Sequence, residues 1–247
     1  MKFMRAIVIA IVCTPLLQCS GGGGDSDGED LSRNACPVLG LNSRIIQGTT
    51  CGESNSPVVE VTIVTLRGEI GLCSGTLLTS NDVLTAAHCF FDGAISAQVE
   101  VGNQSSTVAE VTNHPNVAVD PDTGATFNDV SILRLRTPLS ASTLPVISER
   151  EIRVGDTVSI FGYGLNADGI PEVLRSGQMK VSGVDSEFIA AKFDGEGSNT
   201  CNGDSGGPAV LSYTSGETGV NGVIGVVSSG TNADCLAGDT TFFANLQ

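Results

Sequence analysis

The sequence predicts an all-β, barrel-like protein. From Val58 onwards, short runs rich in β-branched residues alternate with turn residues, and helical periodicity is nearly absent. Glycine is abundant, with 31 of 247 residues, whereas only 16% of the residues are charged. Many turns that join short strands produce this composition. The length suits either one large all-β domain or two small barrels side by side.

The expected elements follow in chain order. Strands are predicted where apolar or β-branched residues lie between turn residues, for example at 58–66, 75–78, 98–101, 130–135, 157–161, 179–181 and 223–227. A single helical turn is expected at 86–89, within a run of small residues. The stretch 138–145 begins and ends with proline and is predicted to join the two halves.

The N-terminus is typical of an export signal. Lys2 and Arg5 precede an apolar stretch, 6–17, that is too short to span a membrane as a helix. The following Leu16-Leu17-Gln18-Cys19 resembles a bacterial lipobox, in which Cys19 is lipidated and becomes the mature N-terminus. The alternative is an ordinary signal peptide before a disordered start. We therefore expect a signal peptide at 1–18 and a tether with an activation propeptide at 19–44.

Charge and cysteine content limit the classes of partner. A net charge of −15 argues against nucleic-acid binding, which needs a basic surface. The chain has eight cysteines. With Cys13 in the leader and Cys19 as the lipidation candidate, six remain, and their pairing is open from the residues alone. The absence of a Cys-x-x-Cys pair argues against zinc, and we expect neither a metal nor a cofactor.

Three segments carry residue types suited to nucleophilic catalysis. His88 lies in the small-residue run before Cys89, whereas the chain's other histidine, His114, lies in a loop-like Asn-His-Pro-Asn stretch. Ser205 lies in Gly203-Asp204-Ser205-Gly206-Gly207, whose glycines permit a tight turn and free backbone N–H groups for an oxyanion. Asp129 stands at the head of an apolar strand, where a carboxylate needs a partner such as an imidazole N–H.

The order of these residues along the chain excludes one rival. The Gly-x-Ser-x-Gly pattern also fits the nucleophile elbow of α/β-hydrolases, but that fold needs a histidine after the serine. No histidine follows Ser205. The order His88, Asp129, Ser205 therefore favours a catalytic triad.

These segments together resemble the chymotrypsin/trypsin family of serine endopeptidases. The matching regions are 84–89, 128–135 and 201–208, in the same order as in the family, and 44–48 resembles its activation site. The likeness extends from about Ile45 to Asn245, and we expect the protease domain at 45–247. The resemblance implies two six-stranded antiparallel β-barrels with the active site in the cleft between them.

The resemblance also implies roles for individual residues. Ser205 would be the nucleophile, His88 the general base and Asp129 the residue that orients it, with the N–H groups of Gly203 and Ser205 as the oxyanion hole. Activation would follow a cut between Arg44 and Ile45, after which the new α-ammonium inserts beside Asp204. Ser228 matches the position that hydrogen-bonds the triad aspartate, and Ser228, Ser229 and Gly230 would bind the substrate backbone.

Disulfides are likewise assigned by resemblance. Cys73–Cys89 and Cys201–Cys235 match family bridges. The family partner of Cys51 is missing, because Ser176 lies about where it should be, so we expect Cys36–Cys51. That bridge would keep the cleaved propeptide attached.

The specificity pocket departs from the trypsin pattern. Asn199 stands where trypsin-like enzymes carry an aspartate, which predicts a neutral side chain before the cleaved bond. Thr241 projects into the pocket in this alignment, whereas Asp239 would restore a negative charge if the alignment slips by two. Ser229 replaces the family's usual tryptophan, and Gly230 leaves the mouth of the pocket open.

The sequence therefore predicts an exported serine endopeptidase that acts on protein or peptide substrates and needs an activating protease. We expect a monomer, held at a membrane only through a lipid on Cys19, as an outer-membrane or cell-surface lipoprotein, or otherwise periplasmic or secreted. The alternatives are a catalytically weak or non-proteolytic binding protein on the same scaffold, an esterase with the same triad, and a structural surface lipoprotein.

Overall fold

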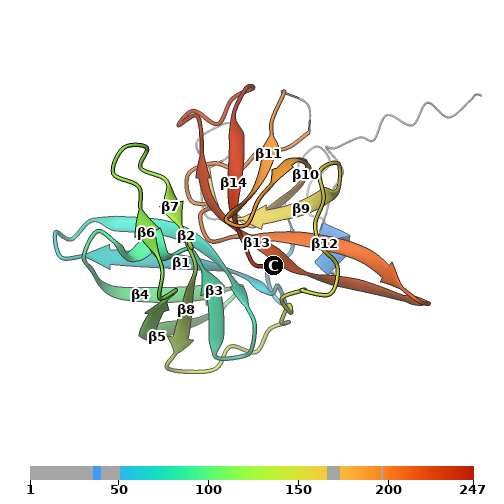
Figure 1. Cartoon of the computed structure of the whole chain (residues 1–247). Helices are drawn as coiled ribbons and strands as arrows, with labels where there is room; N and C mark the ends of the chain where they lie inside the picture. The colour runs from blue at the N-terminus through green and yellow to red at the C-terminus, as the bar shows by residue number, and fades with distance from the viewer. Residues whose placement is uncertain (1–35, 40–50, 166–172, 196) are drawn as a thin grey trace, which may run out of the picture.

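The computed structural model describes residues 36–39, 51–165, 173–195 and 197–247. Over these residues the chain forms two closed six-stranded antiparallel β-barrels that lie side by side (Figure 1). The all-β, two-barrel fold predicted from the sequence and its family resemblance is confirmed. Cys19, Arg44 and Ile45, with the predicted signal peptide, lie outside the described residues.

The first barrel has the strand order β1-β2-β3-β8-β5-β4. Its strands are β1 (Val58–Thr65), β2 (Ile70–Leu77), β3 (Asp82–Thr85), β4 (Ala94–Val101), β5 (Gln104–Asn113) and β8 (Ser131–Leu135). Alternate residues of β1 are buried, which is the pattern of a strand with one face on a barrel core. The short 3₁₀ helix η2 (Ala87–Phe90) leaves this barrel directly after β3, where the sequence predicts a helical turn.

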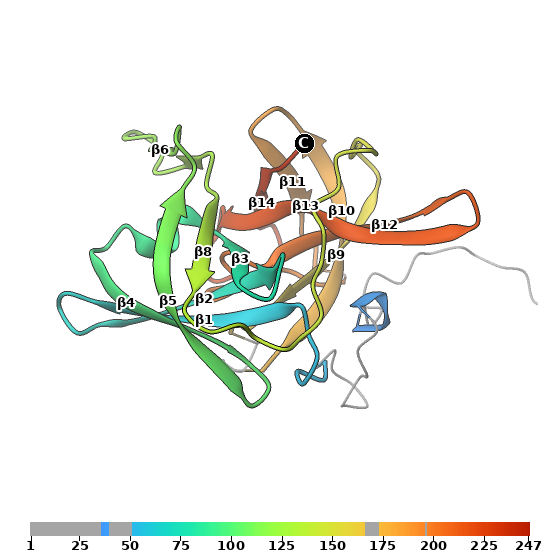
Figure 2. The same cartoon turned by 90° about the horizontal axis from the view of Figure 1, so that it is seen from below.

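The second barrel has the order β10-β11-β14-β13-β12-β9. Its strands are β9 (Thr157–Gly162), β10 (Arg175–Val184), β11 (Phe188–Lys192), β12 (Pro208–Ser215), β13 (Thr218–Gly230) and β14 (Thr240–Asn245). The β12–β13 hairpin extends well beyond the barrel wall (Figure 2). A two-stranded sheet of β6 (Ala118–Val119) and β7 (Thr126–Phe127) and a 3₁₀ helix η1 (Cys36–Leu39) complete the described elements.

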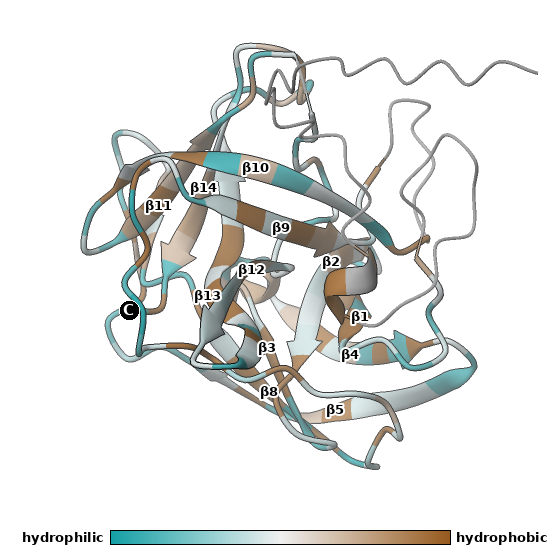
Figure 3. Ribbon diagram, turned by 90° about the vertical axis from the view of Figure 1, so that its right-hand side faces the viewer, coloured by the Kyte–Doolittle hydropathy of each residue, from teal (hydrophilic) through white to brown (hydrophobic). Residues whose placement is uncertain are grey.

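Each barrel has its own apolar core, and a third cluster joins the two. Brown apolar bands interrupted by paler residues mark the strands β9 and β13 in Figure 3. The joining cluster draws Val58 and Leu84 from the first barrel and Phe161, Val210 and Val226 from the second. It fixes the barrels relative to each other, because burial of these side chains needs both surfaces. Among the described helices, none is long and apolar enough to cross a membrane.

Candidate active site

His88 is held by both its backbone and its ring. It lies in η2, whose Cys89 is bridged to Cys73 of β2. The backbone N–H of His88 donates to Asp129 Oδ1 at 2.9 Å, and its Nδ1 lies 2.7 Å from Asp129 Oδ2. Because an ionised carboxylate only accepts, this contact requires the proton on Nδ1 and leaves Nε2 as an acceptor. The imidazole is therefore oriented for proton abstraction.

Asp129 is fully buried, with no exposed surface. It comes two residues before β8, after Asn128, which adopts a left-handed conformation with φ +50°. In addition to the two donors of His88, the hydroxyl of Ser228 donates to Oδ2 at 2.5 Å. Three hydrogen bonds offset the cost of burying this carboxylate. The Ser228 contact is the one that the family resemblance implies.

The segment around Ser205 packs against the residues that precede His88. The backbone N–H of Ser74 donates to Ser205 O at 2.7 Å, and Gly206 N–H donates to Val227 O at 2.8 Å. A Cβ on Gly206 would lie 2.1 Å from Thr85 Oγ1 and 3.0 Å from the N atom of Ala86. The loop after Ser205 thus lies against the strand end that leads into η2. The fold brings the Ser205 loop to the His88–Asp129 pair.

Ser74 organises this contact and carries no signature in the sequence. Its hydroxyl donates to Gly203 O at 2.9 Å and accepts from Tyr163 N–H at 2.9 Å, while Thr85 Oγ1 donates to its carbonyl. Ser74 is completely buried. It therefore ties the first barrel to the loop that bears Gly203. Only the fold reveals this role, since Gly203 lies 129 residues further along the chain.

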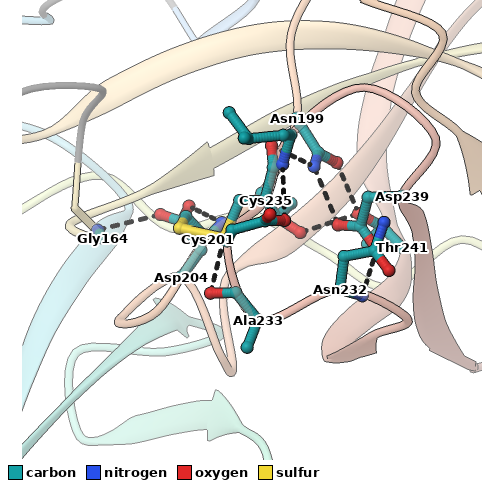
Figure 4. Close-up of a disulfide and its surroundings, with 12 residues drawn as sticks. Gly164, Asn199, Cys201, Asp204, Asn232, Ala233, Cys235, Asp239 and Thr241 are labelled. Atoms are coloured by element: carbon teal, nitrogen blue, oxygen red, sulfur yellow. Dashed lines mark hydrogen bonds between the residues drawn. A yellow bond between two sulfur atoms is a disulfide. The ribbon is translucent and has the colours of Figure 1, made fainter.

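The carboxyl group of Asp204 accepts hydrogen bonds from two backbone donors. Gly164 N–H donates to Oδ1 at 2.9 Å and Cys201 N–H to Oδ2 at 2.8 Å (Figure 4). Burial raises the pKa of Asp204 to about 6, although these two hydrogen bonds and the charge of Arg175 act in the opposite direction. A cavity of about 590 Å³ lies beside it, lined among others by Gly164, Arg175 and Asn199.

Asn199, Thr241 and Asp239 form a connected polar group near the Cys201–Cys235 bridge (Figure 4). Asn199 Nδ2 lies 2.9 Å from Asp239 Oδ2, and Thr241 Oγ1 donates to Asn199 Oδ1 at 3.0 Å. Both residues considered for the pocket, Thr241 and Asp239, therefore contact Asn199 directly. The connection of Asp239 to the pocket comes through a side chain and requires no slip in alignment.

Among the described residues there are three disulfides, Cys36–Cys51, Cys73–Cys89 and Cys201–Cys235, the pairs expected from the sequence. Ser176 stands about where the family's usual partner of Cys51 would be. Its Oγ lies 3.3 Å from Cys36 Sγ, so Ser176 borders the Cys36–Cys51 bridge. The ligand atoms of Cys73, His88 and Cys89 lie close together, but the two sulfurs are bonded to each other. His114 follows β5 as a half-buried loop residue, and its Nδ1 accepts the Asn116 N–H at 3.3 Å.

Comparison with known proteins decides the family. The Trypsin family model matches residues 45–247. The chain belongs to the trypsin family. Brachyurin from Leptuca pugilator is 33% identical over 188 residues, which cover 67% of this chain and 79% of that protein. Trypsin 5G1 from Aedes aegypti is 29% identical over 253 residues, covering 90% and 88% of the two chains.

A solved structure of HL collagenase shares the fold. It has a TM-score of 0.66 and 23% sequence identity, with 82% of this chain and 94% of that chain covered. Membership of the trypsin family makes this protein a serine endopeptidase, a hydrolase of peptide bonds.

Proposed function

We propose that this trypsin-family protein is an exported endopeptidase that works through His88, Asp129 and Ser205 and is activated by a cut between Arg44 and Ile45. The observation that carries the proposal is the fully buried Asp129, which binds both the backbone and the ring of His88. A carboxylate and an imidazole in this arrangement, beside a glycine-flanked serine, form the acid–base machinery of acyl transfer.

The reaction proceeds in two halves. Ser205 Oγ attacks the carbonyl carbon of the substrate while His88 Nε2 takes the hydroxyl proton, and Asp129 stabilises the resulting imidazolium. Collapse of the tetrahedral intermediate breaks the C–N bond as His88 gives that proton to the leaving amine. Water, deprotonated by His88, then attacks the acyl-enzyme, and Ser205 leaves with the proton restored to its oxygen.

The oxyanion of each tetrahedral intermediate would be bound by the N–H groups of Gly203 and Ser205. Neither N–H has a hydrogen-bond partner among the described residues. Gly203 has φ +96°, and its carbonyl is fixed by Ser74. Ser228, Ser229 and Gly230 at the end of β13 would pair with the substrate backbone, as an added strand.

Activation rests on Asp204 and the cavity beside it. The raised pKa of Asp204 marks a carboxylate that lacks a strong cationic partner among the described residues. A cut after Arg44 would create an ammonium on Ile45 that can enter this cavity and pair with Asp204. Such a buried pair suits a switch, because it forms only after the cut. The family match also begins at residue 45.

Export is the expected location. The three disulfides indicate an oxidising compartment. We propose that 1–18 is removed as a signal peptide, that 19–44 serves as tether and propeptide, and that 45–247 is the protease domain. Cys19 is the proposed lipid site, which places the enzyme at an outer membrane or cell surface. Without that lipid it would be periplasmic or secreted.

Peptide hydrolysis tests the proposal. The exported protein is cut after Arg44 with bead-immobilised trypsin, the beads are removed, and casein and a peptide library are added. We expect cleavage of both, and none with Ser205→Ala protein treated in the same way. Equal background hydrolysis by the two proteins, with the cut confirmed by mass spectrometry, would refute the proposed activity.

A further inference from the structure

Gly164 and Leu165 lie directly against the loop that bears Gly203. A Cβ on Gly203 would lie 2.9 Å from the Cα of Gly164, and a Cβ on Gly164 would lie 2.6 Å from the carboxyl carbon of Asp204. The backbones approach this closely because both positions are glycine. We call Gly164 and Leu165 the support segment. Any displacement of this segment would displace the loop with it.

Two hydrogen bonds join the support segment to the loop. Gly164 N–H donates to Asp204 Oδ1 at 2.9 Å (Figure 4), and Leu165 N–H donates to Asn202 O at 2.8 Å. The Asn202 carbonyl and the Gly203 N–H belong to one planar peptide unit. Because a trans unit directs these two groups to opposite sides, holding the carbonyl fixes the direction of the N–H. Leu165 therefore aims the proposed oxyanion donor.

Arg175 holds the support segment from the other side. This residue begins β10, and its Nη1 donates to Gly164 O at 3.0 Å. The Gly164 carbonyl and the Leu165 N–H again form one planar unit. A guanidinium only donates and keeps its charge at every relevant pH. The peptide unit of the support segment is thus fixed at both ends, at its oxygen by Arg175 and at its N–H by Asn202.

The two peptide units form a series that begins at a cation. Arg175 lies at the first oxygen, Leu165 N–H lies at the second oxygen, and Gly203 N–H is the end of the series. A positive charge at the first oxygen polarises both units in the same direction, which makes each following N–H a stronger donor. Among the described residues, Gly203 N–H has no partner. A developing oxyanion would gain from such a pre-polarised donor.

The charge of Arg175 also acts on Asp204. Both residues line the cavity of about 590 Å³, and Arg175 is half-buried. Burial raises the pKa of Asp204 to about 6, and the charge of Arg175 counteracts this rise. Partial burial makes such a charge more effective than a charge in open solvent. One side chain thus influences both ends of the segment from Gly203 to Asp204.

We infer that Arg175 is a positioning residue for the oxyanion hole: by holding Gly164 O, it fixes and polarises the support segment and, through it, the Gly203 N–H that would stabilise the tetrahedral intermediates. This inference rests on the proposed function and adds to it a residue outside the triad. Arg175 acts through two peptide units and contacts no reacting atom.

A matched substrate and two inhibitors test the inference. The exported protein is cut with bead-immobilised trypsin, and the library peptide that the wild type cleaves fastest is prepared as a fluorogenic amide, a trifluoromethyl ketone and an alcohol. With the ketone, Ser205 Oγ adds to the carbonyl carbon, its proton passes to His88, and the carbonyl oxygen becomes an anion in the oxyanion hole. The alcohol binds without reacting. All measurements are made well above the pKa of about 6 of Asp204, so that this group is ionised.

Arg175→Met removes the charge and the donor. We expect kcat for the amide to fall by about 10-fold with KM nearly unchanged, because the lost interaction matters only once the oxyanion forms. The Ki of the ketone should rise by a similar factor, whereas the Ki of the alcohol should stay the same. Arg175→Lys keeps a cationic donor and should recover part of both losses.

The matched control is Arg150→Met. Arg150 is also half-buried, and its guanidinium is paired with Asp156. Its loss should lower thermal stability but change neither kcat nor the Ki of the ketone. If Arg175→Met fails to fold, Arg175→Gln carries the test, because it keeps an N–H donor and loses only the charge. The same changes in kcat and Ki are then expected, in the same direction and smaller.

Three results would overturn the inference. They are a kcat of the Arg175 variant within about two-fold of that of Arg150→Met, an unchanged Ki of the ketone, or an equal rise in the Ki values of ketone and alcohol. The last would show a general loss of structure. Absence of hydrolysis by the cut wild type, at the level of Ser205→Ala protein, would instead refute the proposed function on which the inference rests.

Discussion

At the scale of single residues, two buried carboxylates have opposite environments. Asp129 accepts three hydrogen bonds, two of them from His88, whereas Asp204 accepts two backbone hydrogen bonds and lines a cavity. Asp129 therefore fixes the orientation of the His88 ring. Asp204 is the carboxylate that, in our proposal, gains a cationic partner after the cut.

Asp129→Asn should abolish most activity without unfolding the protein. An amide NH₂ facing His88 would force Nδ1 to accept, so the ring proton moves to Nε2. A protonated Nε2 has no lone pair with which to take the Ser205 proton. We expect turnover of a peptide substrate to fall on the order of 10⁴-fold. Thermal unfolding checks that the fold persists, and the exposed Asp92→Asn is the control. Turnover within a few-fold of wild type would contradict the assigned role of Asp129.

Asp204 should make the stability of the uncut protein depend on pH. Its pKa is about 6 when folded, against 3.8 as the ordinary value. Between these values the folded state holds a proton that the unfolded state has released, so the free energy of unfolding falls as pH rises from about 4 to about 6. The loss should reach roughly 3 kcal/mol. Urea unfolding of the uncut protein at several pH values measures it.

Two comparisons isolate the contribution of Asp204. Uncut Asp204→Asn should lack the slope between pH 4 and 6, because the amide does not titrate. The protein cut after Arg44 should lose most of the slope too, since an ammonium beside Asp204 would lower its folded pKa towards the unfolded value. Identical pH profiles for wild type and Asp204→Asn would contradict the assignment.

At the scale of elements, the loop after Ser205 depends on close backbone approach. Gly206 has φ +85°, and a Cβ there would lie 2.1 Å from Thr85 Oγ1 and 2.2 Å from Ser74 O. Gly216, at the tip of the β12–β13 hairpin, has φ +63° with nothing within 4 Å. The two glycines share the need for a left-handed backbone but differ in crowding.

Gly206→Ala should therefore be far more harmful than Gly216→Ala. We expect the hairpin variant to lose about 1–2 kcal/mol of unfolding free energy from backbone strain alone. The loop variant should lose at least ~3 kcal/mol, because strain and a backbone clash add, and it should also lose activity. Chemical denaturation of both proteins measures the difference. Equal losses would show that the loop is not tightly packed.

The elements differ in how much the sequence reveals of them. The contact of His88 with Asp129 and the neighbouring Ser205 loop are predictable, because each residue lies in a short local pattern and the three occur in a diagnostic order. Strand β5 is missed because most of its residues are exposed and polar, so it lacks the alternation that marks β1. The contacts of Ser74 with Gly203 and of Asp239 with Asn199 join residues 129 and 40 positions apart, and local patterns carry no such information.

At the scale of the whole molecule, the segment before the proposed cut is attached to the protease domain. Cys36 is fully buried and bonded to Cys51, and Asn221 Nδ2 of the long hairpin donates to Val38 O at 2.7 Å. The bridge spans the Arg44–Ile45 bond and closes a separation of 15 residues. A cut there would leave two chains joined by a disulfide.

Non-reducing gels of the cut protein should show one band, and reducing gels two chains. The double variant Cys36→Ser/Cys51→Ser should release the propeptide without reductant and should lose roughly 3 kcal/mol of unfolding free energy before the cut, the loop-entropy value for this separation. Release of the propeptide from the cut wild type on a non-reducing gel would show that the bridge does not hold it.

The measurement that tests the central claim most directly uses a fluorophosphonate probe on the exported protein, with and without a cut after Arg44. Mass spectrometry locates the labelled residue and verifies the cut. A cut-activated triad predicts rapid labelling at Ser205 in the cut sample and little in the uncut one, and none in His88→Ala. Absence of labelling in folded protein with a verified cut, or equal labelling of the His88→Ala variant, would contradict the account.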